Sequence, residues 1–144
     1  MSQKRTDNPG IYHIILTKPF FDLPAGRVIY IGKGNDVEYR LKQELGKVSG
    51  AATFFRSIGV MLAKTVIPGS GKNFRFYDQQ GIADWLEKHT EHTLIRCDWR
   101  KEEKKLIKKY KPPFNITHNT RHCHPDLREL RKTALATARK QSAS

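Results

Sequence analysis

Two short runs of β-branched and aromatic residues stand near the start of the chain. Residues 11–16 have the sequence Ile-Tyr-His-Ile-Ile-Leu, and residues 27–32 have the sequence Arg-Val-Ile-Tyr-Ile-Gly. Such runs favour β-strands. The intervening residues 18–26 contain two prolines and a late glycine, which is typical of a connecting loop. We therefore predict that the two strands pair as a hairpin.

Helical periodicity dominates the rest of the chain. Apolar residues recur at three- to four-residue spacing, and three of these segments begin at an aspartate that can cap the first turn. A short third strand is predicted over residues 93–97. The predicted helices cover residues 36–45, 53–63, 78–89, 98–110 and 125–140. This order indicates an α+β domain with a small, mostly antiparallel sheet of about three strands flanked by helices.

The length of 144 residues suits one domain with a core of its own. We predict a flexible N-terminal arm over residues 1–9 and a compact domain over residues 10–118. Residues 119–144 are then expected to form a basic helical extension.

Charge narrows the choice of partner. The chain has 27 Lys and Arg against 14 Asp and Glu, a net charge of +13. That excess indicates a polyanionic partner, nucleic acid first and an anionic membrane surface second. No apolar run is long enough to span a bilayer, and the N-terminus lacks the apolar centre of a signal peptide. We therefore expect a cytoplasmic protein that does not bind membranes. Binding without catalysis stays open at this point.

One acidic residue interrupts the apolar face of the helix predicted at residues 98–110. At 100° per residue, Glu103 falls inside this face, whereas Glu102 lies at its polar edge. A carboxylate there is costly unless it pairs with a basic side chain or binds a cation. The apolar face itself consists of Trp99, Leu106, Ile107 and Tyr110.

Two further features carry polar chemistry. Arg40 and Glu44 lie one turn apart beside the apolar face of the helix predicted at 36–45, the spacing of a solvated, helix-stabilising pair. Asn115 comes directly after Phe114 and a Pro-Pro stop, where an amide often ties a loop together.

These residues occur in the order found in a known family. Gly10-Ile11-Tyr12 stands first and Tyr30-Ile31-Gly32-Lys33 second, and Arg40 follows Gly32 by eight residues. Glu103 and the segment Lys111-Pro112-Pro113-Phe114-Asn115 complete the series. The chain thus resembles the GIY-YIG nuclease superfamily over about residues 10–115, as a small standalone member.

The resemblance implies a metal-dependent DNA endonuclease that hydrolyses phosphodiester bonds, nicking or cutting double-stranded DNA. Glu103 would hold a single Mg²⁺ or Mn²⁺ ion. Arg40 would contact the scissile phosphate. The resemblance also favours Glu103 over Glu102, on the face that would meet Tyr12 and Tyr30.

In the same arrangement, Tyr30 would act as general base or orient the attacking water, with Tyr12 beside it. Nearby cations, Lys33 in particular, must favour the phenolate if the tyrosine is to act as a base. Otherwise it only orients water. Asn115 would order the site through hydrogen bonds.

One position departs from the family. Many members place a His or Tyr four residues after the arginine, and here that position holds Glu44. Glu44 is then either a second acidic group near the metal, or the missing role falls to His13 or to the tyrosines.

Basic side chains outside this set are the expected contacts with DNA phosphates. We expect no obligate protein partner, a monomer or weak homodimer, and association with the nucleoid. A non-catalytic DNA-binding protein on the same fold and an RNA-cleaving toxin are the alternatives. The proposed contacts are Arg56, Lys104, Lys108, Arg121, Arg128 and Arg131.

Overall fold

The computed structural model describes residues 8–48, 52–69, 73–116, 119 and 122–143. Arg121 and most of the predicted N-terminal arm therefore lie outside the described residues. The described elements are β1 (Gly10–Leu16), β2 (Val28–Gly34), α1 (Val37–Glu44), α2 (Thr53–Met61), β3 (Val66–Pro68), β4 (Phe74–Phe76), α3 (Gln79–His89), β5 (Thr90–Arg96), α4 (Trp99–Tyr110) and α5 (Leu127–Ala143).

The main sheet has three antiparallel strands in the order β2-β1-β5. Strand β1 is central, which explains why six of its seven residues are buried. The predicted hairpin of β1 with β2 is confirmed, and Tyr12 lies opposite Gly32 within it. The third strand is longer than the predicted residues 93–97. The α+β architecture with helices around a small antiparallel sheet is thus confirmed.

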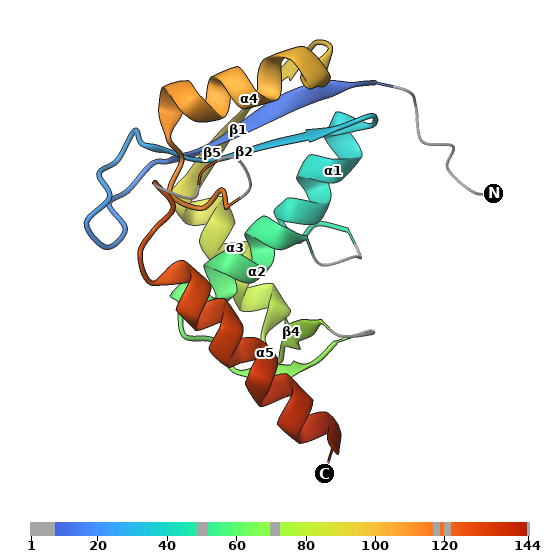
Figure 1. Cartoon of the computed structure of the whole chain (residues 1–144), viewed down its shortest axis with the longest axis vertical. Helices are drawn as coiled ribbons and strands as arrows, with labels where there is room; N and C mark the ends of the chain where they lie inside the picture. Colours follow the sequence, from blue (N-terminus) through green and yellow to red (C-terminus); the bar gives the residue numbers. More distant parts are fainter. Residues whose placement is uncertain (1–7, 49–51, 70–72, 117–118, 120–121, 144) are drawn as a thin grey trace, which may run out of the picture.

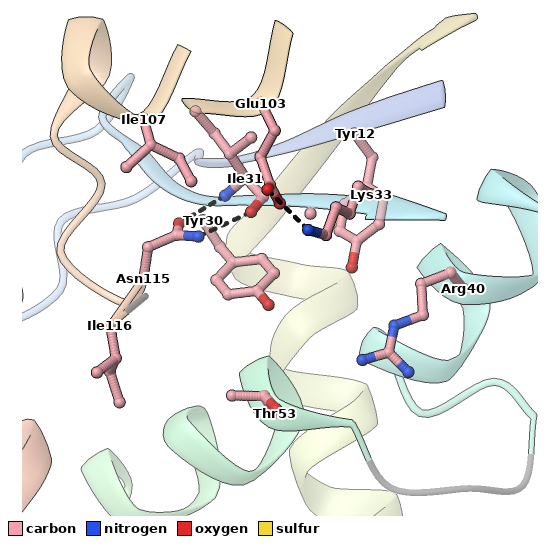
Figure 2. A pocket seen from close by; sticks show the side chains of 11 residues that line it. Tyr12, Tyr30, Ile31, Lys33, Arg40, Thr53, Glu103, Ile107, Asn115 and Ile116 are labelled. Atoms are coloured by element: carbon pink, nitrogen blue, oxygen red, sulfur yellow. Dashed lines mark hydrogen bonds and ion pairs between the residues drawn. The ribbon is translucent and has the colours of Figure 1, made fainter. Parts of the chain in front are cut away.

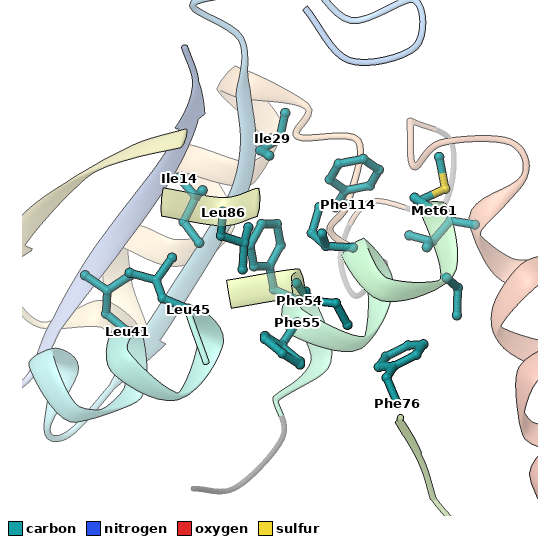
Figure 3. Close-up of a cluster of buried hydrophobic side chains, with 14 of the residues drawn as sticks. Ile14, Ile29, Leu41, Leu45, Phe54, Phe55, Met61, Phe76, Leu86 and Phe114 are labelled. Carbon is teal, nitrogen blue, oxygen red and sulfur yellow. The ribbon is translucent and has the colours of Figure 1, made fainter. Parts of the chain in front are cut away.

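Helices cover both faces of this sheet (Figure 1). Helix α4 lies on one face, where Ile107 packs against Ile11 and Ile31. Helices α1, α2 and α3 lie on the other face, over a larger core that includes Ile14 and Phe54 (Figure 3). Alternate residues of a strand point to opposite faces, so neighbours in β1 belong to different clusters.

The segment between α2 and α3 holds a second, two-stranded sheet that the sequence pattern did not predict. Strand β3 pairs with β4 in an antiparallel register. Phe76 of β4 is buried against Gly59 of α2, where a Cβ would overlap the phenyl ring. Each strand has three residues, too few for an alternating pattern to be recognised in the sequence.

Helix α5 packs along α2 and β3. Its apolar residues Leu127, Ala134 and Ala138 are buried in the main core. At 17 residues it is the longest described helix. None of the helices in the described part combines the length and the apolar character needed to cross a bilayer.

Candidate active site

A cleft of about 220 Å³ opens beside β2, at the edge of the main sheet (Figure 2). All six residues that the resemblance implies line it, although they come from β1, β2, α1, α4 and the segment after α4. The cleft is lined by Tyr12, Tyr30, Ile31, Gly32, Lys33, Arg40, Thr53, Glu103, Ile107, Asn115 and Ile116.

Tyr12 and Tyr30 lie near each other in the lining of this cleft. The ring centroids of Tyr12 and Tyr30 are 6.2 Å apart. Tyr12 lies across Gly32, its partner in the β1–β2 hairpin, and a Cβ on Gly32 would overlap the phenol ring. A glycine at this position therefore lets the Tyr12 ring lie against the backbone of β2.

Glu103 reaches the cleft around the edge of the sheet. Its helix packs on the face that contains Ile11 and Ile31, whereas Tyr12 belongs to the cluster on the opposite face. Glu103 nevertheless lines the same cleft as Tyr12 and Tyr30, whereas Glu102 does not. β2 is an edge strand, and side chains from both faces of the sheet line one opening beside it (Figure 2).

Lys33 pairs with Glu103 at this opening. The distance from Lys33 Nζ to Glu103 Oε1 is 2.8 Å, and Nζ also lies 4.4 Å from the centroid of the Trp99 ring. The ion pair expected as an alternative to a bound cation thus exists, and it uses only Oε1. Among the described residues, Oε2 of Glu103 has no hydrogen-bond partner and is left to contact a cation.

Asn115 fixes the edge of β2. Its Oδ1 accepts a hydrogen bond from the Ile31 amide and its Nδ2 donates one to the Ile31 carbonyl, both at 2.8 Å. The Phe114 amide donates to the Ile29 carbonyl at 2.9 Å, so this segment takes the place of a neighbouring strand. Asn115 is a positioning residue, because its amide is used by the backbone that carries Tyr30 and Lys33.

We expect Asn115→Ala to lower the free energy of unfolding by about 2–4 kcal/mol, because it leaves a buried N–H and a buried C=O of Ile31 without partners. Denaturation in urea measures the change. Asn73→Ala, at an exposed position, is the matched control. Equal stability of the two variants would show that the amide does not hold β2.

Glu44 lies beneath the cleft and is fully buried. The Tyr12 hydroxyl donates to its Oε2 at 2.9 Å, and the Phe54 amide lies 3.4 Å from its Oε1. The expectation of a solvated pair with Arg40 was therefore wrong. The helix turns Glu44 toward Tyr12, and no salt bridge joins it to Arg40 among the described residues.

Burial raises the pKa of the Glu44 carboxyl above 4.5. The positive charge of Arg40 opposes this shift, and hydrogen bonds with Tyr12 and Tyr30 oppose it to a smaller extent. Between pH 4.5 and the raised value, the unfolded chain loses this proton while the folded chain keeps it. The contribution of Glu44 to stability is therefore complete at low pH and falls as the pH rises through that window.

Glu44→Gln removes this titration. We expect the stability of the variant relative to the wild type to increase as the pH rises from 4.5 through the raised pKa of Glu44. Urea denaturation of both proteins across this range measures the difference at each pH. A difference that is constant with pH, or that moves in favour of the wild type, would contradict a raised pKa.

Both tyrosines hold their protons firmly. Burial raises the pKa of Tyr12 and of Tyr30 above 10, and the negative charge of Glu44 raises both further. Arg40 opposes the shifts, but Lys33 is not among their causes. These pKa directions favour tyrosines that orient water over a phenolate base.

His13 does not substitute for the group that Glu44 replaces. It follows Tyr12 in β1 and so points to the opposite face, where its ring lies 5.3 Å from that of Tyr110. Burial, together with the positive charge of Lys109, lowers its pKa. It does not line the cleft.

The expected DNA contacts fall into two groups. Lys104, Lys108 and Arg128 are exposed. Arg56 on α2 and Arg131 on α5 are partly buried, close to the cleft residue Thr53. Thr53 was not predicted as a site residue, because nothing in the sequence around it indicates that the first turn of α2 borders the cleft.

Comparison with known proteins agrees with this geometry. A family model described as the GIY-YIG catalytic domain matches residues 10–141. The match includes every described residue of the cleft and most of α5. No curated protein and no solved structure matches the chain significantly.

Proposed function

Because the chain belongs to the GIY-YIG family, we propose that it is a metal-dependent DNA endonuclease that hydrolyses phosphodiester bonds in the cleft beside β2. The observation that carries the proposal is the convergence of six residues, distant in sequence, on one opening. Hydrolysis requires a positioned water, stabilisation of charge on the phosphate and help for the leaving oxygen. The cleft offers a side chain for each requirement.

Glu103 suits a single Mg²⁺ or Mn²⁺ ion. It is the one carboxylate among the residues that line the cleft, and no cluster of three or more His, Cys, Asp or Glu occurs in the described part of the chain. Mg²⁺ often binds through one or two carboxylates and keeps waters and phosphate oxygens as its other ligands. The bound ion would act as a Lewis acid on the scissile phosphate.

Arg40 is the proposed partner of that phosphate. Its guanidinium borders the cleft, and the hydrogen bond that it donates to Gln43 Oε1 is long at 3.4 Å. A planar guanidinium can donate two parallel hydrogen bonds to phosphate oxygens. The charge that builds up on these oxygens during hydrolysis would then strengthen both bonds.

Tyr12 and Glu44 supply a route for the proton of the attacking water. The Tyr12 hydroxyl already donates to Glu44 Oε2. As water attacks phosphorus, its proton would pass to the phenolic oxygen while the phenolic proton passes to the Glu44 carboxyl group, which must be ionised to accept it. Tyr12 stays neutral throughout, which agrees with its raised pKa, and Tyr30 helps to orient the water.

DNA is the proposed substrate, since the net charge is +13 and exposed Lys104, Lys108 and Arg128 are suited to phosphate contacts. Supercoiled plasmid and tRNA, incubated side by side with the protein and Mg²⁺, test this choice. We expect the plasmid to be nicked or cut and the tRNA to stay intact. Cleavage of tRNA alone would favour an RNase, and salt-sensitive binding without cleavage of either would favour a non-catalytic binding protein.

A further inference from the structure

Two arginines from different helices lie beside the proposed active site, and both contact Phe74. Arg56 belongs to α2, and its Nε donates to the Phe74 carbonyl at 3.1 Å. Arg131 belongs to α5, and its Nη1 donates to the Thr53 carbonyl at 3.0 Å and to Ser57 Oγ at 3.1 Å. Thr53 itself lines the cleft, so Arg131 brings α5 to the cleft rim.

The charges of these arginines are poorly compensated. No salt bridge joins Arg40, Arg56 or Arg131 to a carboxylate in the described part of the chain. Burial lowers the pKa of both Arg56 and Arg131, and the charge of Arg56 lowers the pKa of Arg131 further. Glu44, when ionised, opposes the shift at both arginines.

Holding two partly buried guanidiniums near each other costs free energy unless an anion compensates their repulsion. The hydrogen bond from Arg56 to Phe74 of β4 uses Nε, and the hydrogen bonds from Arg131 to α2 use Nη1. Both terminal nitrogens of Arg56 and Nη2 of Arg131 have no acceptor among the described residues. These donors suit a phosphate group.

We propose that Arg56 and Arg131 form a second phosphate subsite, which binds a phosphodiester group of the DNA strand next to the one that is cleaved. The inference rests on the proposed function, because it assumes that Arg40 and Glu103 hold the scissile phosphate. It makes α5 part of the substrate site. A strand bound this way runs from the Glu103 side of the cleft past Thr53 toward α5.

DNA binding without cleavage tests the subsite directly. Fluorescence anisotropy in EDTA measures the Kd of a short duplex for the wild type and for Arg131→Gln, Arg56→Gln and Arg139→Gln. Arg139 is exposed on α5, is not among the proposed DNA contacts and serves as the matched control. We expect the first two variants to bind about 10- to 100-fold more weakly, as for loss of a charge-assisted hydrogen bond, and the control to change far less.

Duplexes that carry one uncharged methylphosphonate link at successive positions identify the contact. At one position, the methylphosphonate should weaken binding of the duplex to the wild type. The same duplex should bind Arg131→Gln and Arg56→Gln about as well as the unmodified duplex does, because these variants have already lost the contact. Equal sensitivity of wild type and variants at every position would overturn the subsite. Melting curves verify folding. If Arg131→Gln fails to fold, Arg56→Gln alone decides the test.

The proposed nuclease activity is assayed separately with Mg²⁺. A protein that shows the methylphosphonate coupling but never cleaves would contradict the proposed activity and keep the subsite. A protein that cleaves DNA without the methylphosphonate coupling would support the proposed activity and overturn the subsite.

Discussion

Glu103→Gln is expected to slow DNA cleavage about 10³-fold or more while the protein stays folded. The substitution keeps the shape of the side chain but removes the one carboxylate among the described residues that line the cleft. A Lewis-acid ion contributes several kcal/mol of charge stabilisation, and each 1.4 kcal/mol corresponds to a factor of ten in rate. Initial rates of plasmid nicking, measured as a function of Mg²⁺ concentration, give the size of the loss.

Glu102→Gln is the matched control for this variant, because Glu102 precedes Glu103 in α4 but does not line the cleft. Loss of the partner of Lys33 should cost little stability, since the Lys33 side chain is 39% exposed. A Glu103→Gln protein that cleaves as fast as the Glu102→Gln protein would show that the metal, if required, binds elsewhere.

Arg40→Ala is expected to reduce cleavage by about 10²- to 10³-fold, the usual cost of removing one group that stabilises transition-state charge. It should also lower stability at neutral pH, because Arg40 is the main charge that opposes the raised pKa of buried Glu44. Single-turnover rates and urea denaturation separate the two effects.

Arg40→Lys distinguishes charge from geometry. The lysine keeps the positive charge near Glu44, so we expect stability close to that of the wild type, but it cannot donate a bidentate pair to a phosphate. Cleavage should stay well below the wild-type rate. Lys42→Ala, at an exposed position on the same helix, is the control. Full activity in Arg40→Lys would mean that a point charge suffices.

The sequence predicted the main sheet because β1 and β2 have strong strand composition and a loop rich in proline and glycine between them. It predicted helices with Asp36, Asp78 and Asp98 as N-caps, and each side chain accepts a backbone hydrogen bond as expected. The β3–β4 pair was missed, because its three-residue strands are held by packing against α2 and α5 rather than by a local pattern.

The candidate site shows the same division between local and tertiary information. The family resemblance implied that Arg40 and Glu103 belong to one site, and both line the cleft. The burial of Glu44 did not follow from its spacing to Arg40, because its partners Tyr12 and Phe54 come from β1 and α2. A helical pattern alone cannot distinguish a solvated carboxylate from one that is turned toward a strand.

The central claim is that the cleft beside β2 hydrolyses DNA with the help of a metal ion at Glu103. Supercoiled plasmid incubated with equal amounts of wild-type and Glu103→Gln protein, in Mg²⁺ and in EDTA, tests it most directly. We expect the wild type to convert the plasmid to nicked or linear DNA in Mg²⁺ alone, and the variant to leave it supercoiled. Intact plasmid with the wild type in both Mg²⁺ and Mn²⁺, or equal cleavage by the two proteins, would contradict the claim.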